Sequence, residues 1–293
     1  MAVDLGRVGL WVRSTTWPTD PGALRDAAAE AERLGFGAVW LGGSAGDLVL
    51  PEAILDATDQ LVVATGIVNV WTEPAGLASA SYARVARRHA DRFLLGLGAG
   101  HAENVEPVTG ERYVQPLRKV RGYLDDLDAA QPPVPVDRRV LAALGPKVLA
   151  LAGERAAGAH PYLVTPEHTR QAREILGPGP LLAPEQKVLL ETDPQRARTA
   201  ARAAVGFYLA LPNYANNLLR LGFTADDLAG GGSDRLIDGL VAWGDVDTVL
   251  AKVAEHHAAG ADHVCLQAIN PTYTDGGFPL PEWRELAAGL PGR

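Results

Sequence analysis

The sequence lacks cysteine pairs, long apolar runs and an excess of basic residues. Its one cysteine, Cys265, cannot form a disulfide within the chain, and no stretch reaches the roughly 18 uninterrupted apolar residues of a membrane span. The first residues, Met1 to Val12, show no long apolar segment after a basic start, as a secretory signal peptide would. We therefore expect a cytoplasmic protein that has no membrane partner.

The charge balance makes nucleic acid an improbable main partner. The 293 residues carry 27 Lys and Arg against 35 Asp and Glu, a formal net charge of −8. Such a surface disfavours contact with a phosphate backbone, although it is compatible with a local basic pocket for one phosphorylated small molecule. The hydrophobic share of 47% is enough for a large core.

Motifs for metal binding and for side-chain nucleophiles are also missing. The sequence has no C-x-x-C, no H-E-x-x-H and no G-x-S-x-G. His256 and His257 are adjacent, so on a helix they diverge instead of meeting at a metal ion. We expect no metal site. These absences favour chemistry carried by a bound cofactor that the protein positions.

Short apolar runs alternate with alanine-rich helical stretches along the chain. Three helices end in a glycine just before a strand, at Pro21–Leu34, Lys147–Ala157 and Val246–Ala259. The predicted strands are Arg7–Val12, Ala38–Leu41, Leu61–Val70, Phe93–Gly98, Val140–Leu144, Ala159–Val164, Gln186–Glu191 and His263–Ile269. Eight strands suit a closed (β/α)8 barrel, while an open, doubly wound sheet gives the same alternation.

Two segments interrupt this alternation. Residues 101–137 contain a polar loop, a helix near Gln115–Ala129 and a proline-rich end, and residues 208–243 contain a run of glycines. We interpret both as insertions after barrel strands, where lids and pocket walls are commonly built. The chain is otherwise assigned to one α/β domain, residues 1–293.

The most conspicuous motif is Gly-Leu-Gly-Ala-Gly-His at 96–101, directly after an apolar strand. A dinucleotide fingerprint needs G-x-G-x-x-G followed by a helix, and here the third glycine comes one position early. We favour a strand end at which Gly98, Ala99 and Gly100 let a planar ligand approach the backbone. Packing of the barrel layers is the alternative.

The exit of the third strand also carries candidate residues. Trp71 is suited to lie against an aromatic cofactor or to cap the barrel. Thr72 and Glu73 precede a proline at the start of the next helix, whose backbone amides can face an anion.

Two later strand exits have the chemistry of an anion site. Gly145, Pro146 and Lys147 form a turn that brings a cation to a helix N-terminus, unless the lysine is simply solvated. Thr165 is a predicted N-cap, and His168 falls in the first turn of the following helix. A surface position is the alternative for that histidine.

Together these residues resemble the luciferase-like monooxygenase superfamily, whose members are α/β barrels that bind FMN or the deazaflavin coenzyme F420. The matching segments are LGFGAVW at 34–40, ATGIVNVW at 64–71, RFLLGLG at 92–98, LGPK at 144–147, HPY at 160–162, LPNY at 211–214 and GADHVC at 260–265. They are similar to a branch described as probable F420-dependent oxidoreductases.

The resemblance implies that the cofactor ring lies across the barrel mouth. One face would meet the end of the third strand, where relatives often carry a bulge or a non-proline cis peptide, here Val70–Thr72. The residues that would hold the cofactor are Gly42, Gly43, Val70, Trp71, Thr72, Gly98, Ala99, Gly100, Leu144, Gly145, Pro146, Lys147, Thr165 and His168. The aromatic candidates for a substrate wall are Trp11, Trp40, Trp71 and Tyr113.

One departure from the family concerns catalysis. Many F420-using relatives carry an acidic residue and a histidine, or a glutamate, at the end of the second strand. This sequence has Gly42, Gly43 and Ser44 there, and no acid or base before Asp47. His101 and Glu73 are therefore the candidate catalytic residues for proton transfer.

The function that we expect is hydride exchange between F420 and a small organic substrate. An FMN-dependent monooxygenase of the same superfamily is the first alternative, and a non-catalytic flavin-binding protein is the second. An NAD-dependent dehydrogenase ranks last, because no suitable acid follows the glycine motif. Members of the superfamily are often dimers, so a homodimer is also expected.

Overall fold

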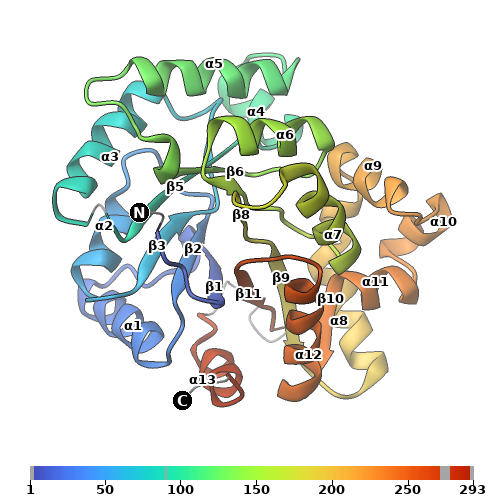
Figure 1. Ribbon diagram of the computed structural model, residues 1–293. Coiled ribbons are helices and arrows are strands. Elements are labelled where there is room, and N and C mark those ends of the chain that lie inside the picture. The colour runs from blue at the N-terminus through green and yellow to red at the C-terminus, as the bar shows by residue number, and fades with distance from the viewer. Residues whose placement is uncertain (1–2, 90, 271–277, 291–293) are drawn as a thin grey trace.

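A computed structural model describes residues 3–89, 91–270 and 278–290. Its parallel strands form one curled sheet surrounded by helices (Figure 1). The barrel strands are β1 (Val8–Arg13), β2 (Ala38–Gly42), β3 (Val62–Thr65), β5 (Phe93–Gly98), β6 (Arg139–Leu141), β7 (Gly158–Ala159), β8 (Leu181–Leu182), β9 (Glu185–Leu190) and β11 (Val264–Ala268).

The sheet closes through one continuous segment. β8 pairs with β7, and after residues 183–184 the same segment continues as β9, which pairs with β11. Since β11 pairs in turn with β1, every barrel strand has a neighbour on both sides. With β8 and β9 taken as one barrel strand, the predicted (β/α)8 barrel is confirmed.

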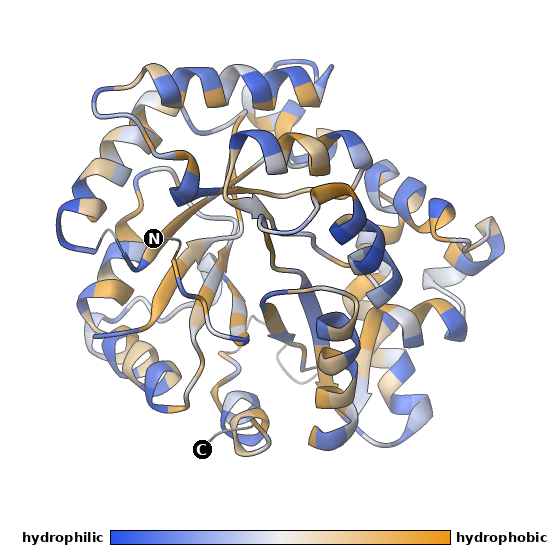
Figure 2. Cartoon of the chain, viewed as in Figure 1, coloured by the Kyte–Doolittle hydropathy of each residue, from blue (hydrophilic) through white to orange (hydrophobic). Residues whose placement is uncertain are grey.

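Helices cover the outside of this barrel. They are α1 (Pro21–Arg33), α2 (Val49–Asp56), α3 (Ala75–His89), α4 (Ala102–Thr109), α5 (Pro116–Ala129), α6 (Pro146–Arg155), α7 (Pro166–Leu176), α8 (Pro194–Leu209), α9 (Pro212–Arg220), α10 (Ala225–Leu228), α11 (Asp234–Leu240), α12 (Val246–Ala258) and α13 (Leu280–Ala288). Many begin with proline, whose fixed φ suits the first helical turn. The helices that pack on the sheet, such as α1 and α12, carry both hydrophobic and hydrophilic residues along their length (Figure 2). No helix among the described residues is long and apolar enough to span a membrane.

The predicted third strand is broken in the structure. It consists of β3 and of β4 (Val68–Asn69), and the peptide bond between Gly66 and Ile67 in the gap is cis. The cis peptide expected at Val70–Thr72 therefore lies earlier in the chain, and the placement of that feature was wrong. Val70 instead continues the pairing of β4, because its amide donates to the carbonyl of Gly98 at 3.0 Å.

Other strands also differ in length from the prediction. Of the predicted strand Ala159–Val164, only Ala159 belongs to a regular strand, β7 (Gly158–Ala159), since Pro161 has no N–H to donate. The stretch 208–243 forms α9, α10 and α11, and then an unpredicted strand, β10 (Val241–Gly244), which pairs with β9.

The barrel interior is apolar and aromatic in its lower layers. Trp40 is fully buried there and stacks on His160, with ring centroids 4.1 Å apart. The role of Trp40 as a substrate wall is therefore wrong, because the ring is part of the core. β9 differs from its neighbours: part of it is hydrophilic (Figure 2), and it brings charged side chains into the upper layer.

Candidate active site at the barrel mouth

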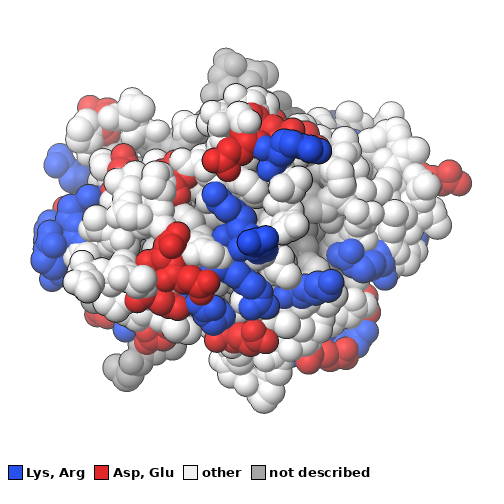
Figure 3. Space-filling model, turned by 90° about the horizontal axis from the view of Figure 1, so that it is seen from above, with Lys and Arg blue, Asp and Glu red and all other residues white. Residues whose placement is uncertain are grey.

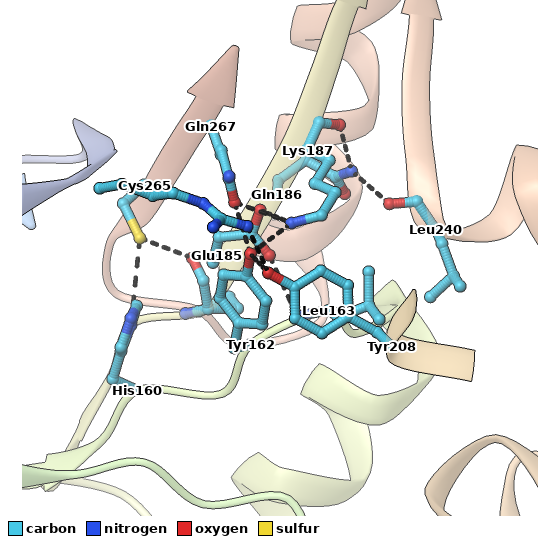
Figure 4. A network of polar contacts seen from close by, with 12 residues as sticks. His160, Tyr162, Leu163, Glu185, Gln186, Lys187, Tyr208, Leu240, Cys265 and Gln267 are labelled. Carbon is cyan, nitrogen blue, oxygen red and sulfur yellow. Dashed lines mark hydrogen bonds and ion pairs between the residues drawn. The ribbon is translucent and has the colours of Figure 1, made fainter. Parts of the chain in front are cut away.

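A buried polar network fills one side of the mouth, beyond the carboxyl end of β7, in the first half of β9 and near the carboxyl end of β11 (Figure 4). The ammonium group of Lys187 donates to the hydroxyl of Tyr162 at 2.7 Å, to Gln267 at 2.7 Å and to Glu185 at 3.2 Å. The hydroxyl groups of Tyr162 and Tyr208 are 3.1 Å apart. A chain of polar groups therefore runs from a buried lysine to the C-terminus of α8.

Burial sets the protonation of this network. Lys187 and Glu185 are each 1% exposed, and their charges balance as an ion pair. Burial raises the pKa of the Glu185 carboxyl, while Lys187 and the amide of Leu163 act in the opposite direction. Burial, together with nearby Glu185, raises the pKa of Tyr162 well above its ordinary value. Tyr162 thus keeps its proton at neutral pH.

Trp11 covers the exits of the second and third strands. A Cβ added to Gly42 would lie 2.2 Å from the indole ring of Trp11, and one added to Gly66 would lie 2.9 Å from its Nε1. The missing Cβ of Gly42 therefore makes room for a tryptophan, and the predicted contact of Gly42 with a cofactor stays a prediction. Gly43 differs: its φ is +68°, and a Cβ there would meet no atom within 4 Å.

Two buried nitrogens beside Gly66 have no hydrogen-bond partner among the described residues. Nε1 of Trp11 and Nε2 of His160 are both within 3.3 Å of the position that a Cβ of Gly66 would take. His160 also contacts the carbonyl of Ala183 through Nδ1 at 2.7 Å, which we assign as its protonated nitrogen. Burial lowers the pKa of His160 to about 4, so the ring is neutral. Its Nε2 is then an acceptor, and the indole N–H is a donor to the same small space.

A basic corner lies at the exits of β6 and β7. Gly145 is the N-cap of α6 and has no side chain of its own to cap the helix, and Lys147 is exposed in the first turn. A guanidinium nitrogen of Arg220, at the end of α9, would lie 3.9 Å from a Cβ at Gly145. Nδ2 of Asn217, one turn earlier on α9, is buried and has no hydrogen-bond partner within the described part of the chain. Donors from two elements therefore meet around Gly145.

Thr165 and His168 fix the adjoining helix. Thr165 is the N-cap of α7, as predicted, and its side chain accepts from the amide of His168 at 3.3 Å. The ring of His168 is turned inward, with Nε2 at 2.9 Å from the carbonyl of Leu144. Burial lowers its pKa. His168 is thus a neutral, buried residue that holds the turn before Pro146, and its surface alternative is wrong.

α9 also reaches the exit of β5. His101, at the start of α4, contacts Oδ1 of Asn213 through Nδ1 at 3.1 Å, and its ring lies 5.3 Å from that of Tyr214. Burial lowers the pKa of His101, so it is a neutral group at physiological pH. The structure gives it no contact with Glu73, the other predicted catalytic residue.

Glu73 lies in a separate cavity of about 720 Å³ between the exit of β4 and α5. Its carboxylate accepts from the amide of Gly46 at 2.8 Å, which holds the loop after β2. Trp71 and Thr72 line the same cavity, and Lys119 lies over the Trp71 ring at 4.8 Å. Trp71 therefore packs toward α5.

On the face seen from above, basic side chains gather near the middle with acidic ones around them (Figure 3).

The glycines after β5 are explained by close packing. A Cβ at Gly98 would lie 3.0 Å from both Ala142 and Ile67, and one at Gly100 would lie 2.5 Å from Asn69. Ala99 is partly buried against the core. Tyr113 donates its hydroxyl to the carbonyl of Gly100 at 3.0 Å. These contacts support the packing alternative for the motif.

A second cavity, of about 250 Å³, opens beside the polar network between β1, β9, β11 and α8. Its lining includes Trp11, Arg13, Lys187, Tyr208 and Gln267, and it shares no lining residue with the cavity that holds Glu73. Arg13 donates to the hydroxyl of Tyr208 at 3.2 Å. Among the described residues, no group of three or more His, Cys, Asp or Glu is placed to hold a metal.

Sequence reasoning missed this polar network. Its only signal was Glu-Gln-Lys at 185–187 inside an apolar strand, where alternation directs the first and third side chains into the barrel. Tyr162 was predicted only to belong to a segment shared with the family, and Tyr208 only to begin an insertion.

Comparison with known proteins confirms the resemblance stated above. A family model described as luciferase-like monooxygenase matches residues 2–130. No curated protein matches the chain.

Solved structures match over nearly the full length. An F420-dependent secondary alcohol dehydrogenase with an F420–acetone adduct has 16% identity and a TM-score of 0.72, covering 99% of each chain. The coenzyme F420-dependent tetrahydromethanopterin reductase of Methanopyrus kandleri has 18% identity and a TM-score of 0.73, covering 97% of this chain and 98% of that one. The oxygenating constituent of 3,6-diketocamphane monooxygenase from Pseudomonas putida, with FMN, has 16% identity and a TM-score of 0.63, covering 98% and 96%. At these identities the likeness establishes the fold.

Proposed function

We propose that this chain is an oxidoreductase that binds the deazaflavin F420 at its barrel mouth and exchanges hydride with a small organic substrate. The observation that carries the proposal is the meeting of anion-binding groups at the exits of β6 and β7. Parallel barrels hold their ligands at this end, and helix N-termini bind phosphate through free amides. The likeness to F420-dependent enzymes supports the choice of cofactor.

The phosphate end of the cofactor is assigned to the basic corner. Lys147 supplies an ammonium group and a backbone amide at the start of α6, and Arg220 supplies a guanidinium from α9. Thr165 uses its oxygen as a helix cap and retains its hydroxyl hydrogen as a donor. Neither cation forms an ion pair with a described residue. Such donors fit the negatively charged oxygens of a phosphate group.

The ring is assigned to the space beyond Trp11, where Gly43 faces open space and Gly66 and Ile67 are partly exposed. When bound, a deazaflavin supplies a carbon centre that donates or accepts hydride. Trp11 and Tyr162 lie side by side, with ring centroids 5.0 Å apart, and exclude water from the apolar wall of the mouth.

Protons are handled by the network on β9, and not by His101 or Glu73. Tyr208 lines the smaller cavity together with Lys187 and Gln267, and its hydroxyl accepts a hydrogen bond from Arg13. The hydroxyl of Tyr208 meets that of Tyr162, which in turn accepts from Lys187. A proton given up at the oxygen of Tyr208 is replaced along this line. This network takes the place of the acid and base absent after the second strand.

A titration with two cofactors tests the proposal. The purified protein is titrated with F420 and, separately, with FMN, and quenching of fluorescence gives the two Kd values. The proposal predicts binding of F420 at least 10-fold tighter than that of FMN. Tighter binding of FMN would favour the FMN-dependent monooxygenase instead. Binding of neither cofactor would contradict the proposal.

A further inference from the structure

The smaller cavity at the mouth is lined by hydrogen-bond donors from Arg13 and Gln267, beside the polar side chains of Thr16 and Asn270. Arg13 uses one guanidinium nitrogen on Tyr208, and it has no acidic partner among the described residues. The oxygen of the Gln267 amide accepts from both Lys187 and Tyr162, which leaves its NH2 group to donate.

No carboxylate lines this cavity among the described residues. Glu185 neutralises Lys187 from below, so the uncompensated charge at the cavity is the guanidinium of Arg13. An array of donors around one positive charge matches the oxygens of a carboxylate, which accepts several hydrogen bonds and pairs with arginine.

The remaining wall and the size limit the ligand further. Trp11, Ala204 and Ile269 supply apolar surface beside the donors. The volume of about 250 Å³ equals roughly eight water molecules at about 30 Å³ each. It is below the roughly 300–1,000 Å³ of sites for drug-sized ligands. The ligand is therefore small and has one anionic end and one apolar end.

We propose that this cavity is the substrate subsite, and that it takes a small monocarboxylate whose carboxylate is held by Arg13 and Gln267. The assignment of this ligand as a substrate rests on the proposed oxidoreductase function, whereas the binding of carboxylate does not. The carboxylate lies within reach of Tyr208, so that the rest of the molecule points toward the centre of the mouth.

The experiment compares benzoate with its neutral amide, benzamide, by calorimetric titration of the cofactor-free protein. The two probes have the same shape and differ in charge. A charge-assisted hydrogen bond contributes about 1.5–3 kcal/mol, so wild-type protein should bind benzoate about 10- to 100-fold more tightly. Arg13→Met should bind the two probes equally, and Arg25→Met, on the exposed face of α1, should keep the wild-type preference.

Three results overturn the proposal: equal affinity for both probes in the wild type, no binding of either, or a benzoate preference that survives in a folded Arg13→Met variant. Tyr208→Phe provides a second variant, since it keeps Arg13 and should retain most of the preference. Titration of the same samples with F420 reports on the proposed function separately. If the protein does not bind F420 but still prefers benzoate, the cavity is a carboxylate site that has no role in hydride exchange.

Discussion

The ammonium nitrogen of Lys187 lies 2.7 Å from the hydroxyl oxygen of Tyr162, within the mouth of a closed parallel barrel. Lys187 is buried and Tyr162 is partly buried, and the counter-charge comes from Glu185 on the same strand as Lys187. A buried cation beside a tyrosine hydroxyl is an arrangement that can hold and pass on a proton.

Removing the lysine should destabilise the protein strongly. Lys187→Met leaves Glu185 buried without its cation, and breaking such a pair costs about 3–5 kcal/mol. The double variant with Glu185→Gln should recover more than half of that loss. Urea denaturation gives the free energies of unfolding. A loss below about 1 kcal/mol in the single variant would mean that the pair is not buried as described.

Tyr208→Phe should slow turnover and leave cofactor binding intact. The substitution removes only the hydroxyl that reaches the smaller cavity, and positioned acid–base groups contribute about 10²- to 10⁴-fold. The rate of F420 oxidation or reduction with substrate should therefore fall at least 100-fold at an unchanged Kd for F420. Tyr82→Phe is the matched control, because Tyr82 lies on α3 and its ring packs against that of Phe93, away from the mouth. Equal rates for both variants would remove Tyr208 from proton transfer.

Thr165 variants separate helix capping from phosphate binding. Thr165→Val removes both the cap of α7 and the donor, so we expect a loss of about 1 kcal/mol in stability and a weaker Kd for F420 by about 1–2 kcal/mol. Thr165→Ser keeps both. Denaturation and fluorescence titration measure the two effects. If Thr165→Val lowers the stability but leaves the Kd for F420 unchanged, Thr165 acts only as the cap of α7.

Gly42→Ala should disturb Trp11. The added methyl would lie 2.2 Å from the indole ring, and overpacking of this kind costs about 1–3 kcal/mol. Tryptophan emission should shift as the ring moves. Gly122→Ala is the matched control, because no atom lies within 4 Å of its added methyl and alanine favours the α5 helix. An unchanged stability and emission in Gly42→Ala would contradict the packing of Trp11.

Acid should destabilise the protein through buried histidines. Burial lowers the pKa of His160 and His263 to about 4 and that of His256 to about 3. The unfolded chain binds protons below about pH 6.5, while the folded state does not. Stability is thus complete above that pH and falls, by up to about 1.4 kcal/mol per pH unit for each group, as the pH decreases toward 4.

A variant isolates one of these histidines. His160→Gln should reduce the slope of unfolding free energy against pH by about one proton between pH 4 and 6.5. The comparison with wild type cancels the contribution of other groups, including Glu185. An identical slope in the two proteins would show that His160 titrates normally.

The barrel was predictable because its strands and helices follow strong local rules. Proline starts and following glycines placed the ends of α1 and α6 within about two residues, and a following glycine did the same for the end of α12. The division of the third strand and the additional strand β10 could not be predicted from such local rules. The division of the third strand at Gly66–Ile67 depends on contacts across the barrel, and strand β10 exists because β9 offers it a partner.

The site was predictable only in part. Gly145, Lys147 and Thr165 were identified correctly as helix-start residues, because that signal is local. The role of Gly42 depended on Trp11, which lies far away in sequence, and could not be inferred from its own neighbours. Lys187 and Tyr208 meet only through the tertiary fold. Whether any of these residues binds a cofactor stays a prediction.

The most direct test of the account measures F420 binding at the basic corner. The Kd for F420 is determined by fluorescence quenching for wild type and for Lys147→Gln/Arg220→Gln, with Arg25→Gln as the control. Two lost charge-assisted contacts predict a weakening of at least 100-fold in the double variant and none in the control. Equal affinity of all three proteins would contradict the placement of the phosphate, and with it the cofactor site proposed for this barrel.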